Sequence, residues 1–343
     1  MTGEDNTENL QFIRTLVESG LSWFTPPVND ASGLTWQSSG FTDVASQLIR
    51  ELNGMLIPVY YNSPKLKYHI NFSPPEYFQY NNEVTVGYSP WEFTRLPDRK
   101  VHNLNACDEV WATSDFVKEV YLNNGVEKNI EVLPHGLSPD WEMRDREITD
   151  NFYFLLDNGG DLFLKVIYET IVSFMEADLP KEAVLVVKTT KELPNKIIDN
   201  RIKYIDSFLS IEDYRKLFYK CHVMVYPSNG EGFGLVPFQA VGTGMPTITT
   251  HLTGCADYKD HTILWPHNWE EAEPVLQDGS LLYDEDLGEW ISPDFNHLPD
   301  IMVDVFNNYH EYKLDAIHSG KILRSSASWS RIADRMISLL RRD

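Results

Sequence analysis

The chain has 343 residues, which is enough for about two domains of ordinary size. It is 42% hydrophobic and 23% charged, a composition typical of soluble globular proteins and not of disordered, collagen-like or membrane proteins. With 51 acidic and 29 basic residues the formal net charge is −22. This excludes a protein held on nucleic acid or anionic lipid by overall charge, although it does not exclude a local basic cleft.

The cysteines and the N-terminal residues indicate in which cellular compartment the protein is expected. Cys107, Cys221 and Cys255 are far apart in sequence and form no CxxC pair, which argues against a disulfide framework and a zinc ribbon. Residues 1–5 are acidic and polar, unlike a signal or transit peptide. Dense apolar runs such as 183–187 are much shorter than the roughly 20 residues that span a bilayer. We therefore expect a cytoplasmic protein, in the host cytoplasm if a phage encodes it, without a transmembrane segment.

Strand and helix patterns alternate along the first part of the chain. Ser114 is placed to cap a helix that ends at Asn123-Asn124-Gly125. A glycine-bounded loop, 33–40, follows the first predicted strand. The predicted strands are 21–24, 55–60, 67–71, 83–88, 109–113 and 130–133, and the predicted helices are 43–52, 101–105 and 115–122.

A polar stretch at 138–150, which contains Pro139, is predicted to be a linker, and the alternation begins again after it. A final amphipathic helix is predicted at 328–341, with one apolar stripe that suits core packing. The predicted strands of this part are 152–156, 183–188, 202–205, 223–226 and 247–250, and the predicted helices are 164–176, 211–220 and 236–241.

Two successive runs of alternating strands and helices predict an α/β protein with two Rossmann-like, doubly wound domains facing each other across a cleft. We place the first domain at 1–145, joined by the terminal helix at about 326–343, and the second at 146–325. In such sheets ligands bind beyond the carboxyl ends of the strands, so the cleft is the expected site.

The segment 226–246 is the most informative part of the sequence. A strand ends at Tyr226, a glycine-rich loop follows, and a helix begins near Leu235. Such a loop gathers backbone N–H groups and the positive end of a helix dipole, which together favour an anion. Glu231 lies within this loop, where a carboxylate would repel a phosphate unless it faces something else, such as sugar hydroxyl groups. A glycine-rich loop also often does no more than turn the chain.

The segment resembles the donor site of the retaining, GT-B-fold enzymes of glycosyltransferase family 4. The shared residues are Glu231, the run Gly232-Phe233-Gly234-Leu235, Pro237, Ala240, Gly244 and Pro246. The family's second acid, eight residues after the first, is replaced here by Gln239. Similar stretches occur at 91–97, 104–116, 132–137 and 328–329, so the resemblance extends over most of the chain from about residue 86.

The resemblance implies that a sugar is transferred from a nucleotide-sugar donor, with UDP the expected nucleotide, to a hydroxyl acceptor with retention and without a metal. The donor would lie on the C-terminal domain, held by Gly232, Phe233, Gly234, Leu235 and Gln239, with Glu231 at its sugar. The family's diphosphate-binding lysine corresponds to Lys165 or to Lys188, which follows a buried strand. Either lysine could instead be a solvated surface charge.

Further candidates come from the first half of the chain. Gly33, in the loop 33–40, is expected to approach the donor or the acceptor, unless the loop is an ordinary connection. His69, His102 and His135 are candidates on the cleft side, with His135 as a catalytic candidate, although a single histidine is more often a packing residue. The acceptor-side candidates are Trp91, Glu92, Arg95 and His69, with Phe93 beside the first three in the sequence. A structural ion pair would explain Glu92 and Arg95 equally well.

Three functions stay open. The first is transfer to a saccharide, a lipid-linked acceptor or a small molecule. The second is transfer to a hydroxymethylated pyrimidine base of DNA, as in phage enzymes, which would require a flipped base in an aromatic pocket. The third is a non-catalytic protein that binds a sugar or a nucleotide. Its only support is Gln239 in place of the family's second acid and the absence, beside Lys165, of an arginine that the family carries there. The acidic triplet 284–286 is interpreted as a solvated loop and not as a metal site. The oligomeric state cannot be derived.

Overall fold

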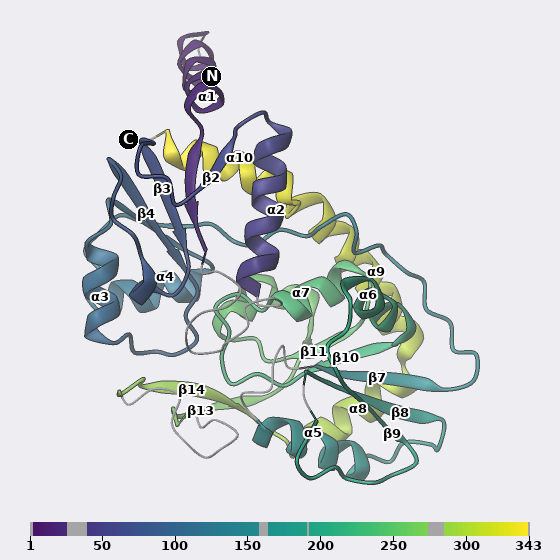
Figure 1. The fold of residues 1–343 in the computed structure, drawn as a ribbon. Coiled ribbons are helices and arrows are strands. Elements are labelled where there is room, and N and C mark those ends of the chain that lie inside the picture. The colour runs from purple at the N-terminus through teal and green to yellow at the C-terminus, as the bar shows by residue number, and fades with distance from the viewer. Residues whose placement is uncertain (1–2, 26–39, 158–163, 191, 274–284, 342–343) are drawn as a thin grey trace. The chain divides into compact units, whose positions relative to one another are not determined.

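A computed structural model describes residues 3–25, 40–157, 164–190, 192–273 and 285–341, and places the chain in two compact units (Figure 1). The first unit consists of residues 1–91, 95–138 and 327–343, and the second of residues 92–94 and 139–326. Most of the loop 33–40, including Gly33, lies outside the described residues. The assignment of an acceptor domain and a donor domain stays a prediction.

The first unit contains a six-stranded sheet in which every neighbouring pair is parallel, in the order β2-β1-β3-β4-β5-β6. Its four central strands, β1, β3, β4 and β5, are fully buried, as expected for a parallel sheet with helices on its faces, whereas the edge strand β2 is largely exposed. The strands are β1 (Leu21–Phe24), β2 (Val59–Tyr61), β3 (Tyr68–Phe72), β4 (Val84–Ser89), β5 (Glu109–Ala112) and β6 (Ile130–Val132).

The helices of the first unit largely follow the sequence signals. Ser114 caps α4 by accepting a hydrogen bond from the Val117 amide, and Ser328 caps α10 by accepting one from the Arg331 amide. The elements are α1 (Gly3–Ser19), α2 (Gly40–Gly54), the short helix η2 (Pro75–Tyr77), α3 (Asp98–Asn105), α4 (Asp115–Asn123) and α10 (Trp329–Leu340).

The second unit repeats the arrangement, with a parallel sheet in the order β12-β11-β10-β7-β8-β9. The strands are β7 (Phe152–Asp157), β8 (Ala183–Thr189), β9 (Ile202–Asp206), β10 (Val223–Tyr226), β11 (Thr247–Thr249) and β12 (Ile263–Leu264). The helices are α5 (Leu164–Glu176), α6 (Ile211–Lys220), α7 (Leu235–Gly242), η3 (Thr253–His261), α8 (Leu298–Asn307) and α9 (Tyr309–Ser326). Two doubly wound parallel sheets confirm the predicted α/β fold class.

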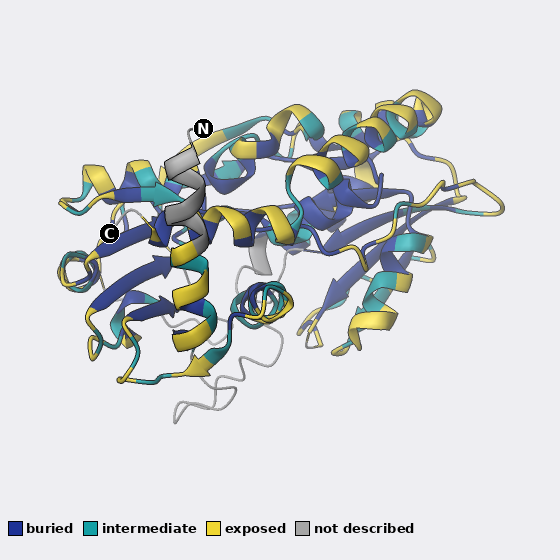
Figure 2. Ribbon diagram, turned by 90° about the horizontal axis from the view of Figure 1, so that it is seen from above, coloured by how far each residue is buried: buried dark blue, intermediate teal, exposed yellow. Residues whose placement is uncertain are grey.

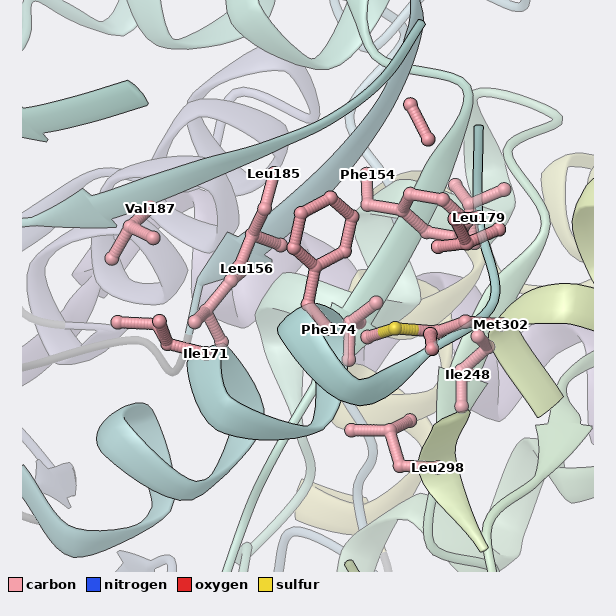
Figure 3. Close-up of a cluster of buried hydrophobic side chains, with 14 of the residues drawn as sticks. Phe154, Leu156, Ile171, Phe174, Leu179, Leu185, Val187, Ile248, Leu298 and Met302 are labelled. Atoms are coloured by element: carbon pink, nitrogen blue, oxygen red, sulfur yellow. The ribbon is translucent and has the colours of Figure 1, made fainter. Parts of the chain in front are cut away.

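The core of the second unit lies between its sheet and the helices α5 and α8 (Figure 3). Phe154 and Leu156 alternate along β7 and meet Phe174 of α5 and Met302 of α8, all at most 1% exposed. Burying one such side chain contributes about 1.5–3 kcal/mol. Figure 2 shows that in each unit the strands are mostly buried (dark blue), while the helices carry exposed residues (yellow) along one side.

Three elements depart from the sequence prediction. The strand predicted at 55–60 begins only at Val59, because Leu56 has φ 64° in the turn that closes α2. The helix α1 was not predicted, since its polar sequence has little apolar periodicity. An antiparallel hairpin of β13 (His267–Glu271) and β14 (Glu289–Pro293) was also not predicted, because its strands lack a regular apolar alternation.

The polar segment predicted as a linker is fixed to the second unit over its first half. Trp141 is 2% exposed and packs against Phe218 of α6. The guanidinium group of Arg146 is buried and donates hydrogen bonds to the carbonyl and hydroxyl oxygens of Thr243. These contacts explain why the second unit begins at residue 139, although the segment has the composition of a loop.

Candidate functional site

The loop between β10 and α7 lies at the carboxyl edge of the second sheet. Gly234, the N-cap of α7, has φ 82°, a left-handed conformation that L side chains rarely adopt. A Cβ atom at Gly234 would lie 2.5 Å from the hydroxyl oxygen of Tyr258 and 2.7 Å from the sulfur of Cys255. Both its conformation and the space around it therefore require glycine, and the chain turns there directly into the N-terminus of α7.

The carboxyl group of Glu231 is held by groups from its own loop and from β10. The Tyr226 hydroxyl donates a 2.6 Å hydrogen bond to Glu231 Oε1, and the Ser228 hydroxyl lies 3.4 Å from the same oxygen. The residue keeps some exposed surface, but protein surrounds the carboxyl group. This desolvation, together with the charge of Glu92, raises the pKa of Glu231 to about 7, although the hydrogen bonds oppose the change. Near neutral pH the group is therefore about half protonated.

The helix η3 braces the loop from the other side. The Glu231 amide donates to the hydroxyl oxygen of Thr253 at 3.1 Å, and the Gly254 amide donates to the Glu231 carbonyl at 2.7 Å. Thr253 has φ 54°, a strained conformation for a β-branched residue. A Cβ atom at Gly254 would lie 2.4 Å from the Phe233 amide nitrogen, so the two backbones are in close contact. The Tyr258 hydroxyl completes the brace by donating to the Gly234 carbonyl at 2.7 Å.

Two charged residues end neighbouring strands at the same edge of the sheet. Asp157 of β7 and Lys188 of β8 are register partners, and both are nearly buried. The Lys188 ammonium donates to the Thr189 carbonyl at 2.8 Å, and Asp157 accepts a 2.8 Å hydrogen bond from the Tyr214 hydroxyl. Lys188 is thus not a solvated surface charge. Lys165 lies in the first turn of α5, and its side chain is outside the described residues.

Gln239 lies in the second turn of α7 and is 6% exposed. Its position on the helix that follows the loop agrees with the predicted spacing, while its role toward a donor stays a prediction. Phe233 of the loop is buried and packs edge-to-face against Phe238 of α7, so its ring fixes the loop to the helix.

The predicted acceptor-side residues Trp91, Glu92, Phe93 and Arg95 are divided between the two units, and their role toward an acceptor stays a prediction. Residues 92–94 belong to the second unit, whereas Trp91 and Arg95 belong to the first. Trp91 is buried, with its indole N–H donating to the Arg95 carbonyl at 3.0 Å, and Arg95 is exposed. The backbone of Glu92 lies against Gly230, where a Cβ atom would be 2.2 Å from the Glu92 carbonyl oxygen. The structure thus brings Glu92 to the loop that carries Glu231.

His135 lies in the first unit, just after β6, among aromatic side chains. The Tyr88 hydroxyl is 2.8 Å from the Leu133 carbonyl oxygen and 3.1 Å from His135 Nδ1. Because a phenol has one hydrogen and the carbonyl contact is shorter, we assign that hydrogen to Leu133 and a proton to Nδ1. Burial lowers the pKa of His135 to about 3, so the ring is neutral at physiological pH. A Cβ atom at Gly136 would lie 2.7 Å from the Trp329 ring, which shows how closely α10 approaches this turn.

The other histidine candidates occupy different surroundings. His69 has no exposed surface in β3, and its ring nitrogens lie 2.7 Å from Ser22 Oγ and 3.3 Å from Asn71 Oδ1. These contacts are those of a packing residue, and we leave His69 out of the site proposed below. His102 is exposed on α3.

Possible metal ligands and membrane-spanning helices are considered next among the described residues. Within the described ranges, no group of three or more His, Cys, Asp or Glu side chains is arranged to hold a metal ion. Of the acidic triplet, Glu285 and Asp286 are described, and Asp286 accepts a hydrogen bond from the Gly288 amide at 2.8 Å. No helix in the part of the chain that the structure describes is both long and apolar enough to cross a bilayer.

Sequence reasoning missed Tyr226, Thr253, Tyr258 and Asp157 as members of this site. Tyr226 and Asp157 each end a strand at the carboxyl edge, which is a signal that the sequence offers. Thr253 and Tyr258 lie beyond β11, and only their contacts with the loop at 231–234 place them there.

Residues 157–273 match the family of glycosyl transferases group 1. The matched segment lies within the second unit. A segment of 51 residues, 15% of the chain, is 37% identical to glycogen [starch] synthase of Dictyostelium discoideum, and it spans 6% of that relative's length.

Solved structures resemble this chain over almost its whole length. HepE of Anabaena, in a complex with UDP and glucose, has a TM-score of 0.61 at 11% identity, with 94% of this chain and 99% of that chain covered. Sucrose-phosphate synthase of Thermosynechococcus elongatus has a TM-score of 0.59 at 15% identity, with 99% and 94% covered. At these identities the likeness concerns the fold, and it agrees with the GT-B architecture of two Rossmann-like domains.

Proposed function

We propose that the chain transfers a sugar from a nucleotide-sugar donor, a UDP-sugar, to a hydroxyl acceptor with retention at the anomeric carbon. The observation that carries the proposal is the braced loop at 227–234, which leads from the carboxyl end of β10 to the N-terminus of α7 with Glu231 within it. The group 1 match over 157–273 includes this loop.

The donor diphosphate is proposed to lie at the start of α7. Backbone amides of Gly232 to Leu235 and the positive end of the helix dipole favour an anion there. Lys188, at the end of β8, which β7 separates from β10, supplies a positive charge at the same edge of the sheet. Amides and a lysine that are already in place stabilise the charge that develops on the leaving diphosphate. In this proposal they act without a metal ion.

Glu231 is proposed to contact hydroxyl groups of the donor sugar. An ionised carboxylate close to the diphosphate would repel it, but a pKa of about 7 leaves much of Glu231 neutral at physiological pH. A neutral carboxyl group can donate one hydrogen bond and still accept another. The raised pKa therefore suits a carboxyl group that must lie near both a sugar and a diphosphate.

The reaction replaces one C–O bond by another. The bond between the anomeric carbon and the diphosphate breaks with its electron pair going to the diphosphate. The acceptor oxygen bonds to the anomeric carbon, and its proton passes to the departing diphosphate oxygen. Retention follows from the resemblance of 231–246 to glycosyltransferase family 4. His135 stays a proposed residue of the first unit, where its neutral ring can hydrogen-bond with an acceptor.

UDP is the proposed nucleotide, because HepE was solved with UDP and glucose. The acceptor class is left as a saccharide, a lipid-linked acceptor or a small molecule. A modified DNA base stays an alternative that no observation here favours.

The test is a binding screen followed by an assay of transfer. UDP-, GDP- and ADP-sugars are compared by thermal shift, and a bound donor raises Tm by mass action. Donor hydrolysis is then followed by nucleotide release, and the anomeric configuration of any product by NMR. We expect a UDP-sugar to stabilise the protein, and Glu231→Ala to abolish transfer while the fold is retained. The proposal is wrong if no nucleotide sugar binds, or if a crystal with donor places the nucleotide away from 227–235.

A further inference from the structure

The outer edge of β14 holds two segments of the chain at once. At one position, the Ile291 amide donates to the Asn229 carbonyl at 2.7 Å, and the Asn229 side chain donates to the Ile291 carbonyl at 2.8 Å. Two residues earlier along β14, the Thr94 amide donates to the Glu289 carbonyl at 3.1 Å, and the Glu289 amide donates to the Thr94 hydroxyl at 2.7 Å. Because alternate residues of a strand present their backbone groups to the same edge, one strand binds both the donor loop and residues 92–94.

An aromatic contact strengthens this arrangement. The rings of Phe93 and Trp290 are stacked, with centroids 6.4 Å apart and an interplanar angle of 23°. Phe93 is 3% exposed. A stacked pair of this kind contributes about 0.5–1.5 kcal/mol beyond the area that it buries. We call residues 92–94 the strap.

The strap brings the backbone of Glu92 against the donor loop. A Cβ atom on Gly230 would lie 2.2 Å from the Glu92 carbonyl oxygen and 3.4 Å from Glu92 Cβ. Gly230 immediately precedes Glu231, so two acidic residues from distant parts of the sequence share one turn. A negative charge on Glu92 disfavours ionisation of Glu231, and it is one of the influences that raise the pKa of Glu231.

Other titratable groups also face Glu231. Tyr226 reaches it from β10, and Cys255 and Tyr258 lie on η3. Desolvation by burial, and to a smaller extent the negative charge of Glu231, raises the pKa of each of these three groups, so none of them becomes a second anion near neutral pH. Among the groups named here, Glu92 is therefore the one that adds a negative charge.

We propose that Glu92 is a positioning residue that acts through Glu231. The strap is fixed by β14 and places the negative charge of Glu92 beside Glu231, so that Glu231 stays protonated for donor binding. The proposal rests on the proposed function for its effect on the donor. The effect on Glu231 itself does not depend on a donor and can be measured without any ligand.

The first experiment titrates Glu231 in the ligand-free protein by NMR of carboxyl-labelled glutamate, with its signal assigned from Glu231→Gln. We expect Glu92→Gln to lower the midpoint by about one pH unit, while the matched variant Glu270→Gln, on the exposed part of β13, leaves it unchanged. Trp290→Leu, which loosens the strap, should lower the midpoint as well, whereas Trp269→Leu should not. An unchanged midpoint in Glu92→Gln overturns the proposal.

The second experiment measures UDP-sugar affinity against pH. A fall of one unit in the midpoint reduces the protonated fraction at pH 7 from about one half to about one tenth, so Glu92→Gln should weaken binding roughly fivefold at pH 7 and hardly at all at pH 5.5. In a Glu231→Gln background, Glu92→Gln should have no further effect. A loss of affinity that is equal at both pH values, or that persists in that background, overturns the proposal. If no nucleotide sugar binds the wild type, the proposed function fails, while the NMR titration still decides whether Glu92 acts on Glu231.

Discussion

The hydroxyl group of Tyr226 lies 2.6 Å from Oε1 of Glu231, and this hydrogen bond joins the last residue of β10 to the carboxyl group of the donor loop. Tyr226 is itself buried, and desolvation together with the charge of Glu231 raises its pKa well above the ordinary value. The tyrosine therefore stays a donor, and the carboxyl group is the partner whose protonation varies.

Tyr226→Phe removes this donor. The bond favours the ionised form of Glu231, so its loss raises the pKa of Glu231 further. We expect a loss of stability of about 1–2 kcal/mol at pH 8.5, where Glu231 is ionised, and a smaller loss at pH 6. Urea unfolding at the two pH values measures the difference, and equal losses at both would contradict the assignment.

Glu231 should also make the stability of the protein depend on pH. Its folded pKa of about 7 is above the ordinary 4.5, so its contribution is fully present below about pH 4.5 and is lost as pH rises through 7. Glu231→Gln should remove this dependence. The difference between the two proteins should therefore change by on the order of 3 kcal/mol between pH 4.5 and pH 8. Parallel stability curves from denaturant unfolding would show that Glu231 titrates normally.

Lys188→Met tests the diphosphate site. A charge-assisted hydrogen bond contributes about 1.5–3 kcal/mol, so UDP-sugar affinity should fall by at least about tenfold. Uridine, which has no phosphate, should bind both proteins equally if it binds at all. Lys216→Met, on the exposed face of α6, is the control. Calorimetry of each ligand gives the comparison, and an unchanged affinity for the UDP-sugar would remove Lys188 from the site.

Gly234→Ala tests the strain and space at the start of α7. Its φ of 82° and the Tyr258 hydroxyl 2.5 Å from the new Cβ should together cost about 2–3 kcal/mol of stability and weaken donor binding. Gly54→Ala is the control, because a Cβ atom there has no neighbour within 4 Å. Thermal unfolding and donor titration of both variants measure the two effects. Equal stability and equal donor affinity in the two variants would contradict the prediction.

His135 should stay neutral through the physiological range. Its pKa of about 3 lies below the ordinary 6.5, so the stability that it contributes is present above pH 6.5 and is lost as pH falls toward 3. Long-range ¹⁵N–¹H correlation spectra should show a neutral ring protonated at Nδ1 from pH 8 down to pH 5. A ring that gains a second proton near pH 6.5 would contradict the burial described here.

The sequence by itself predicted the alternation of strands and helices in both units. These signals are local: Ser114, Ser210 and Ser328 each cap a helix by accepting a hydrogen bond from an amide three residues later. The loop at 227–234 was found in the same way, because a strand end, glycines and a helix start follow one another within ten residues. A local residue pattern is enough to predict a contact when the two contacting residues lie within one turn of each other in the sequence.

Only the tertiary structure decided what surrounds Glu231. Its brace at Thr253 is 22 residues away, Asn229 meets Ile291 across 62 residues, and Thr94 meets Glu289 across 195. Glu92 lies between Trp91 and Arg95 in the sequence, and only the structure shows that its backbone contacts the donor loop and that Thr94 pairs with β14. The protonation of Glu231 depends on burial and on charges brought together by folding, and a residue pattern does not specify either.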